Sequence, residues 1–283
     1  MSSVEIISFE ILNTFEFSDD INIFHSYSIA NGNEYIFSRK VINRNWLDSN
    51  ISYQNNLIGY GEDPRAFSYR DIPMVYSTLY KDGYHQLNRI CLLDEEKGIW
   101  RWILLWHDKT IAPGKNWSPF VYRDEIYFVH EFSPFRVLKL TNRMNILTDN
   151  VAYLEKVMEI KLTLPLSKSD NYCVARGGSN GLELNDGVVM GFGHSNDLIK
   201  TSDNITALTH RPFIWKIDFS KVNVSIERIE FKWDESYHII DPTSFYKKDN
   251  KYFLVTCETE GNWWQDRPQK GRVCRYEILI NDH

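Results

Sequence analysis

Short groups of acidic, basic and aromatic residues in this sequence have the side chains that substitution at a sugar carbon requires. A carboxylic acid can give a proton to a leaving oxygen or relay one. Arginine, lysine and histidine can hold a phosphate, and arginine does so with paired hydrogen bonds. Tryptophan offers a flat apolar face on which a sugar ring can stack. The groups comprise Arg39; Glu62, Asp63 and Arg65; Lys115, Asn116 and Trp117; His130 and Glu131; Arg176 and His194; and Asp241.

An internal repeat explains how residues so far apart in the chain could meet. Five segments share one pattern: an apolar strand, a polar turn, and then an aromatic or β-branched strand. They cover residues 26–41, 66–80, 119–132, 181–195 and 244–258. The residue types of their turns accept the positive φ of tight hairpins. The turn residues are Asn31-Gly32, Arg70-Asp71, Arg123-Asp124, Asn185-Asp186 and Asp249-Asn250.

Further strands follow most hairpins, so each repeated unit should hold about four strands. Residues 213–219 and 224–231 form one such pair, and residues 151–164 also favour a strand. Repeated four-stranded units of about 50–60 residues are typical of propeller blades. We therefore predict an all-β fold, a five-bladed β-propeller with a central active-site pocket, that forms a single domain over residues 1–283.

The two ends of the chain should close the ring. The apolar stretches VEIISFEIL near the N-terminus and VCRYEILI near the C-terminus are the natural pair of strands. A two-sheet β-sandwich is the alternative to the propeller.

A propeller would bring the polar groups to one mouth, because the first strand of each blade lines the central channel. Burying so many polar groups costs free energy unless they pair with one another or bind a ligand. Each residue alone also has a structural explanation. Asp63 and Arg65 could form an ion pair, Lys115 could lie in a solvated loop, and His194 could be a hydrogen-bonded core histidine.

Composition limits the classes of function. The 283 residues include 32 Lys and Arg against 38 Asp and Glu, a net charge of −6. This balance disfavours a sequence-independent grip on nucleic acid, which needs clustered positive charge. We find no secretion signal and no apolar run near the ~18 residues of a membrane span. We therefore expect a cytoplasmic protein whose four cysteines are reduced and mostly buried.

The stretch Gly-Glu-Asp-Pro-Arg at 61–65 resembles a motif of the β-mannoside phosphorylases, glycoside hydrolase family 130. It is also similar to the related β-1,2-mannosyltransferases and phosphorylases of glycosyltransferase family 108. Residues 114–120, 176–179 and 191–194 fit the same pattern, as does Arg39. Those families are five-bladed propellers with the site at the central mouth, so the resemblance implies this architecture here.

The resemblance makes Asp63 the catalytic residue of an inverting reaction on a mannose-like sugar. It implies that Arg176 and His194, together with Lys115, hold phosphate. The stretches IIDPTSFY and CETEGNWWQDRPQKGR lack the closing pattern of the phosphorylases, which favours a transferase that uses an activated sugar. The residues to which we assign substrate binding are Arg39, Glu62, Arg65, Lys115, Asn116, Trp117, Glu131 and Asp241.

Three functions stay open at this point. In an inverting glycosyltransferase, Asp63 would accept or relay the proton of the acceptor hydroxyl, and the partners would be a nucleotide sugar or sugar phosphate and a glycan acceptor. The sequence has no Gly-x-Gly-x-x-Gly and no clear Asp-x-Asp, so we expect no Rossmann core, metal or cofactor.

The second function is a phosphorylase or an inverting hydrolase. A hydrolase needs a second carboxylate ~6.5–9.5 Å from the first, from Glu131, Asp241 or Glu258. The third is a glycan-binding propeller without catalysis.

Overall fold

A computed structural model describes most of the chain. The described residues are 3–16, 20–42, 45–81, 85–94, 97–108, 114–141, 149–164, 173–185, 187–200, 206–229, 231–260 and 270–281. They form 20 β-strands and no helix, which confirms the predicted all-β class.

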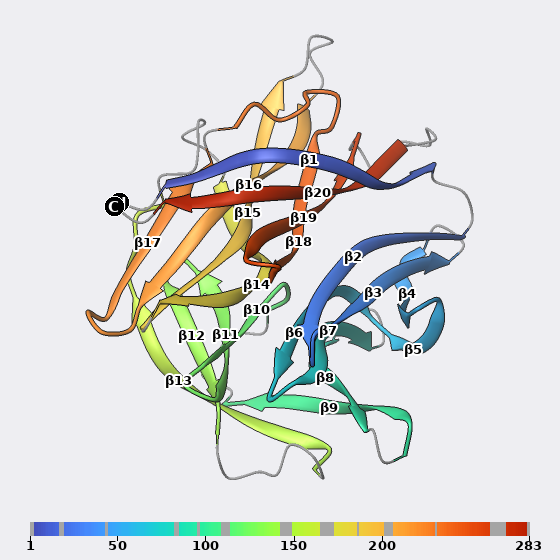
Figure 1. Ribbon diagram of the computed structural model, residues 1–283, viewed down its shortest axis with the longest axis vertical. Coiled ribbons are helices and arrows are strands. Elements are labelled where there is room, and N and C mark those ends of the chain that lie inside the picture. Colours follow the sequence, from blue (N-terminus) through green and yellow to red (C-terminus); the bar gives the residue numbers. More distant parts are fainter. Residues whose placement is uncertain are drawn as a thin grey trace.

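The strands form three sheets (Figure 1). The first holds β2 (Asp20–Ala30), β3 (Asn33–Ile42), β4 (Asn45–Tyr53) and β5 (Asn56–Tyr60). The second holds β6 (Glu62–Tyr69), β7 (Ile72–Lys81), β8 (His85–Asp94), β9 (Ile99–His107), β10 (Ser118–Tyr122), β11 (Glu125–Phe132), β12 (Phe135–Leu140) and β13 (Val151–Ile160). The third holds β14 (Cys173–Asn185), β15 (Val188–Lys200), β16 (Thr206–Asp218), β17 (Asn223–Arg228), β18 (Ile239–Lys248), β19 (Lys251–Thr259), β20 (Lys270–Asn281) and β1 (Ser3–Glu16).

Each of the two larger sheets consists of two antiparallel four-stranded units joined by a parallel contact. In the second sheet β9 runs parallel to β13, where Leu104 is the partner of Val151. In the third sheet β16 meets β18 in parallel at the pair His210 and Ile239. The last unit takes its outer strand from the start of the chain, because β1 pairs antiparallel with β20. This confirms the predicted pairing of the two end strands.

The hairpin turns have the backbone conformation that their residues predicted. Asn31 and Gly32 have φ of 48° and 71°, and the turns at 70–71, 123–124 and 249–250 also have positive φ. The fourth turn lies between Asn185 and Val188, one residue later than predicted, and Gly187 has φ 88°. Asp186, the other residue of that turn, lies outside the described residues.

The first strand of each unit lies at the middle of the molecule (Figure 1). β2 contacts β6, β6 contacts β10, β10 contacts β14, β14 contacts β18, and β18 contacts β2. No ladder joins these first strands to one another, and buried polar side chains form hydrogen bonds between them instead. Ser26 Oγ donates to Thr243 O at 2.9 Å and accepts from Ala66 N–H at 2.7 Å. The Asn180 amide likewise makes two bonds with the Phe245 backbone.

Apolar clusters fill the space between neighbouring units. Phe120 of β10 packs against Trp215 of β16 with ring centroids 5.9 Å apart, and both side chains are fully buried. Phe192 of β15 meets Phe245 of β18 edge to face at 5.1 Å. Such aromatic pairs add about 0.5–1.5 kcal/mol to the free energy gained from burying their area. They hold the units at fixed angles around the middle.

Two further sequence predictions concern the state of the cysteines and the presence of a membrane span. Cys91, Cys257 and Cys274 are buried and unpaired, as expected, whereas the side chain of Cys173 lies outside the described part. In the described part of the chain, no helix is long and apolar enough to cross a membrane.

We expect that deleting residues 1–10 strongly destabilises the protein. The deletion removes the pairing of β1 with β20 from Ser3–Asn281 to Glu10–Arg275, and each ladder hydrogen bond contributes about 0.5–1.5 kcal/mol. Urea denaturation followed by circular dichroism measures the loss. As a control, Ile7→Ser changes an exposed side chain and should leave the midpoint near wild type. An unchanged midpoint in the deletion would show that the closing pair is dispensable.

Candidate functional site

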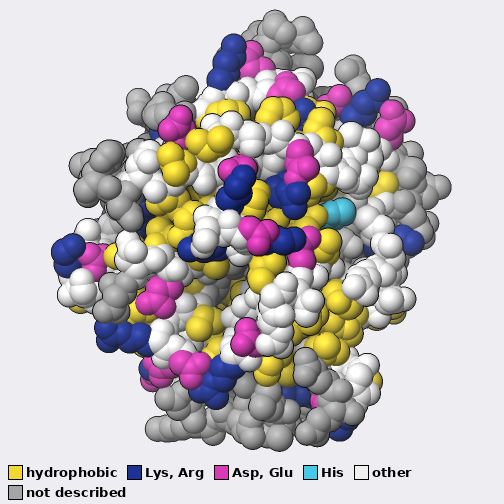
Figure 2. All heavy atoms as spheres, in the orientation of Figure 1, with side chains coloured by type: hydrophobic (Ala, Val, Ile, Leu, Met, Phe, Trp, Pro, Cys, Tyr) yellow, Lys and Arg dark blue, Asp and Glu magenta, His cyan; other side chains and the backbone are white. Residues whose placement is uncertain are grey.

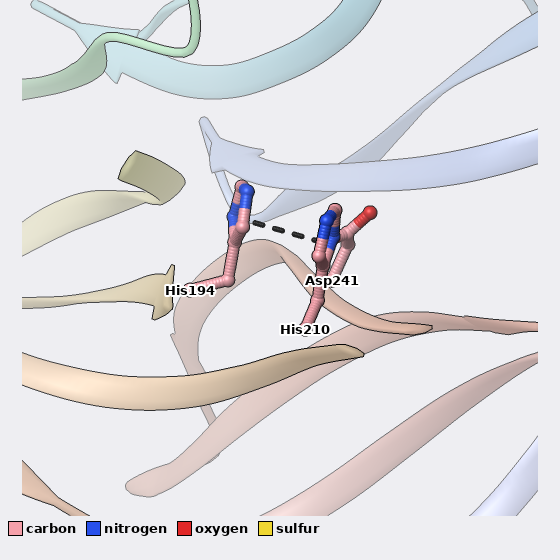
Figure 3. A group of neighbouring side chains, drawn as sticks. All are labelled: His194, His210 and Asp241. Carbon is pink, nitrogen blue, oxygen red and sulfur yellow. Dashed lines mark hydrogen bonds and ion pairs between the residues drawn. The ribbon is translucent and has the colours of Figure 1, made fainter. Parts of the chain in front are cut away.

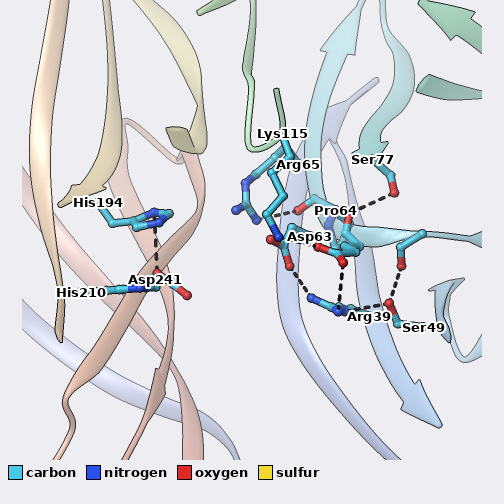
Figure 4. Close-up of polar contacts among 12 residues, drawn as sticks. Arg39, Ser49, Asp63, Pro64, Arg65, Ser77, Lys115, His194, His210 and Asp241 are labelled. Carbon is cyan, nitrogen blue, oxygen red and sulfur yellow. Dashed lines mark hydrogen bonds and ion pairs between the residues drawn. The ribbon is translucent and has the colours of Figure 1, made fainter. Parts of the chain in front are cut away.

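Arg39 and Asp63 form a buried ion pair at the middle of the molecule (Figure 4). Arg39 Nη1 lies 2.6 Å from Asp63 Oδ1, and Arg39 Nε donates to Ser49 Oγ at 2.8 Å. The exposed fractions of the two residues are 3% and 9%. Arg39 comes from the second strand of its unit and Asp63 from the first strand of the next. The pair therefore depends on how two units pack.

Local backbone geometry points the Asp63 carboxylate away from the ladder. The β6–β7 register shifts between Glu62 and Arg65, so two residues of β6 oppose Ser77 alone. Asp63 has φ 47°, in the left-handed region that aspartate enters more readily than most residues. Proline suits position 64, because it has no N–H to lose from a ladder.

The surrounding charges set the state of the two adjacent carboxyl groups. Burial favours a raised pKa for Asp63, but Arg39, Arg65 and Lys115 outweigh it and hold the pKa below its ordinary value. The pKa of Glu62 is raised by burial and by the Asp63 charge, although Arg39 and Lys115 oppose the rise. Lys115 Nζ lies 3.1 Å from Glu62 Oε2. Asp63 is therefore the more readily ionised of the two.

Arg65 lies between two acidic groups and is fully buried. Burial lowers its pKa, whereas Asp63 and Asp241 both raise it. Its Nη1 donates to Pro64 O at 3.3 Å, and its Nε has no hydrogen-bond partner among the described residues. A buried guanidinium with an unused donor is suited to an anionic ligand.

A second cluster faces the first and consists of His194, His210 and Asp241 (Figures 3 and 4). They come from the neighbouring strands β15, β16 and β18. His210 Nδ1 lies 2.7 Å from Asp241 Oδ1, and His194 Nδ1 lies 3.6 Å from the same oxygen. The two imidazole rings stack, with centroids 4.7 Å apart and planes 21° apart.

Burial and charge give this second cluster defined protonation states. Burial lowers the pKa of His194 to about 3, although Asp241 opposes the shift, so the imidazole is neutral at pH 7. Burial by itself raises the pKa of Asp241, but His210, His194 and Arg65 hold it far below its ordinary value. The cluster therefore offers a neutral His194 ring and an ionised Asp241 carboxylate.

Predicted phosphate ligands lie beside this cluster. Arg176 is the register partner of His194 across β14 and β15. Arg176, Lys115, His130 and Glu131 line a pocket of about 190 Å³. In Figure 2, acidic and basic side chains gather near the middle of the visible face. Glu131 is paired at 2.6 Å with Arg136, which also pairs with Glu159.

The residues around Lys115 differ in what they could do for a ligand. Asn116 is buried with φ 62°, and its carbonyl lies so close to Gly177 that an added Cβ would come within 1.9 Å of it. Gly177 therefore lets the loop approach β14. Trp117 is fully buried and stacks on Tyr76 at 5.9 Å. The structure thus places Trp117 in the core, where it has no free face for a sugar.

Two residues have roles that the sequence did not reveal. Glu258 is fully buried and binds Arg272 at 2.8 Å and Thr256 at 2.8 Å, which makes it a structural anchor of the last unit. His210 was missed because it lies on the third strand of its unit. The hairpin repeat carries no signal for that position.

The comparisons with known proteins agree on the fold. The sequence matches no protein-family model and no curated protein. A mannose phosphorylase from Leishmania mexicana, in complex with phosphate ion, has a TM-score of 0.59 at 10% identity and covers 98% of this chain and 92% of its own. A GDP-Man-dependent mannosyltransferase from the same organism has a TM-score of 0.60 at 11% identity and covers 97% and 94%. An α-L-arabinofuranosidase from Lactobacillus brevis has a TM-score of 0.59 at 9% identity and covers 92% and 91%. At these identities the likeness shows the fold alone. This fold agrees with the one that the resemblance of residues 61–65 implied.

We expect Arg39→Met to lower the free energy of unfolding at pH 7 by about 3–5 kcal/mol, because it leaves a buried carboxylate without its partner. The lowered pKa of Asp63 stabilises the fold above the ordinary pKa of aspartate, and this contribution is lost as the pH falls through the folded-state value. The difference between the two proteins should therefore shrink as the pH falls below about 4 and vanish below the folded-state pKa of Asp63. Urea denaturation at several pH values measures the difference.

A matched control is Arg70→Met, which removes an exposed arginine from its pair with Asp124 and should have little effect. A deficit in Arg39→Met that is the same at pH 3 and pH 7 would contradict the ionic explanation.

Proposed function

We propose that this protein is a carbohydrate-active enzyme, an inverting glycosyltransferase that moves a mannose-like sugar from an activated donor to a hydroxyl of a glycan acceptor. The observation that carries the proposal is the Asp63 carboxylate, buried among Arg39, Arg65 and Lys115 and held ionised by them. An ionised carboxylate is suited to accept a proton from a hydroxyl. The basic residues around it suit a phosphate leaving group.

In the proposed reaction, Asp63 takes the proton of the acceptor hydroxyl as that oxygen attacks the anomeric carbon. The bond from this carbon to the donor phosphate oxygen breaks on the opposite face, and the phosphate leaves with the electron pair. Arg65, Arg176 and Lys115 stabilise the charge on the departing phosphate. Neutral His194 adds a hydrogen bond without adding charge, and Asp241 accepts hydrogen bonds from sugar hydroxyls.

Hydrolysis is less well supported than transfer. An inverting hydrolase needs a second carboxylate to activate water. Glu258 is fully buried and anchored by Arg272, which leaves Glu131 and Asp241 as the candidates. A phosphorylase is the second candidate, because the pocket lined by Lys115 and Arg176 could admit free phosphate. One structure with a similar fold is a phosphorylase with bound phosphate, and another is a mannosyltransferase that uses GDP-mannose.

The architecture that we propose for this enzyme is a five-bladed β-propeller, formed as one domain over residues 1–283. The closed cycle of contacts among β2, β6, β10, β14 and β18 supports the blade count. We also propose that the enzyme works in the cytoplasm, which the unpaired buried thiols of Cys91, Cys257 and Cys274 support.

The test is a donor screen with wild type and Asp63→Asn. GDP-mannose, other sugar nucleotides and mannose 1-phosphate serve as donors, simple sugars and short mannosides serve as acceptors, and mass spectrometry detects the product. We expect transfer from a sugar nucleotide, reduced about 10²–10⁴-fold in Asp63→Asn because the proton acceptor is lost. The control Asp124→Asn makes the same change at an exposed turn and should keep full activity.

The outcomes separate the candidates. Activity with mannose 1-phosphate alone would identify a phosphorylase. Full activity in Asp63→Asn would remove Asp63 from the mechanism. Sugar binding that survives in a protein inactive with every donor would indicate a glycan-binding propeller.

The pH dependence should show whether Asp63 acts as a base. Because its pKa is lowered, we expect kcat/KM for transfer to stay level through about pH 4, the ordinary pKa of aspartate, and to fall only at lower pH, where the carboxylate becomes protonated. Initial rates between pH 3 and 8 measure the profile. A rate that rises as the pH falls through this range would instead show that Asp63 acts as an acid.

A further inference from the structure

The ligand atoms of His194, His210 and Asp241 lie within 4.8 Å of one another (Figure 3). Two separations decide what could fit among them: 2.7 Å from His210 Nδ1 to Asp241 Oδ1, and 3.6 Å from His194 Nδ1 to the same atom. Atoms about 2.0–2.2 Å from a tetrahedral zinc ion lie about 3.4 Å from each other. The 3.6 Å separation is close to that value, whereas the 2.7 Å separation is a hydrogen bond that the ion would replace as the two side chains move apart. From this geometry we propose that the three residues bind one divalent transition-metal ion of the zinc type.

Two ring nitrogens of the cluster are unsatisfied. His194 Nδ1 and His210 Nε2 are buried, and neither has a hydrogen-bond partner within the described part of the chain. The exposed fraction of His194 is only 2%. Buried polar atoms without partners are uncommon, because burial removes their hydrogen bonds to water and no other hydrogen bond replaces them. A metal ion would use the lone pair of His194 Nδ1 and would replace the hydrogen bond between His210 Nδ1 and Asp241 Oδ1.

The backbone holds the three ligands in place. All three project from strands, and the β16–β18 contact is anchored at His210 itself. Its N–H donates to His238 O at 3.0 Å, and Arg211 Nη1 donates to both His210 O and His238 O, at 2.8 and 2.7 Å. Ligands fixed on rigid strands need little rearrangement to bind an ion.

The donor atoms select the kind of ion. Two imidazole nitrogens and one carboxylate oxygen suit zinc and its first-row neighbours, whereas calcium and magnesium require mainly oxygen ligands. Three protein ligands leave at least one position open, as in catalytic zinc sites. Asp241 supplies one negative charge and Arg65 adds a positive charge nearby. An anionic oxygen at the open position would therefore balance the charge of the ion. The sequence led us to expect no metal, since the ligands are 16 and 31 residues apart and form no spaced motif.

Metal titration of the full chain tests the proposal directly. Protein freed of metal by a chelator is titrated with Zn²⁺ by calorimetry and with Co²⁺ by visible absorption. We expect one ion per chain, a Co²⁺ spectrum of a low-coordinate nitrogen and oxygen site, and no binding of Ca²⁺ or Mg²⁺ at the same concentrations. His210→Gln and Asp241→Asn should each weaken Zn²⁺ binding about 100-fold or more, since changes to mere supporting residues already cost 10–100-fold.

The control His107→Gln removes a histidine outside the cluster and should bind Zn²⁺ as wild type does. Circular dichroism of the metal-free variants verifies that they are folded, and His194→Gln replaces any variant that is not. Failure of wild type to bind Zn²⁺ and Co²⁺ stoichiometrically overturns the proposal, as does undiminished binding in folded His210→Gln. Because the readout is binding, the result is independent of the proposed transferase activity.

Discussion

The first strands of the five units contact one another without a shared ladder, and the rest of the structure depends on how their backbone groups are satisfied. Buried N–H and C=O groups need partners. Small polar side chains supply them: Ser26 bridges β2 to both β6 and β18, and Asn180 bonds β14 to β18 at Phe245. Because side chains make these connections, no ladder joins the first strands of neighbouring units to one another. They can present charged groups at the middle of the molecule.

Those charged groups alternate in sign, and this alternation makes their burial tolerable. A buried charge without a partner costs several kcal/mol, whereas a chain of opposite charges shares the cost. Asp63 lies between Arg39 and Arg65, and Arg65 also faces Asp241. Asp241 is the last charged group of the series and is bonded to His210 Nδ1. A ligand that carries both phosphate and hydroxyl groups would meet donors and acceptors already held in place, which is the electrostatic condition for catalysis.

The repeated hairpins were predictable because their turns need positive φ. Residue types that tolerate positive φ, such as Asn31-Gly32, can be recognised in the local sequence. The closure by β1 and β20 was also predictable, since two apolar end strands had no other partner. The middle was only partly predictable. Glu62, Asp63 and Arg65 stand together in sequence, so their proximity was assured. Trp117 shares a motif with polar residues, yet nothing local shows which side of the backbone it occupies, and packing against Tyr76 decides it. His210 depends on long-range strand order alone.

The two clusters come from different sheets, and this division links ring closure to chemistry. Asp63 and Arg39 belong to the first two sheets, whereas His210 and Asp241 belong to the third. No ladder fixes the distance between the clusters, which depends on the packing of the first strands. Hydrogen bonds of side chains yield more readily than a sheet. Loosening of the side-chain bonds between first strands would therefore displace Asp241 relative to Asp63 before any unit lost its own four-stranded ladder. The geometry of the middle thus depends on the weakest connections of the fold.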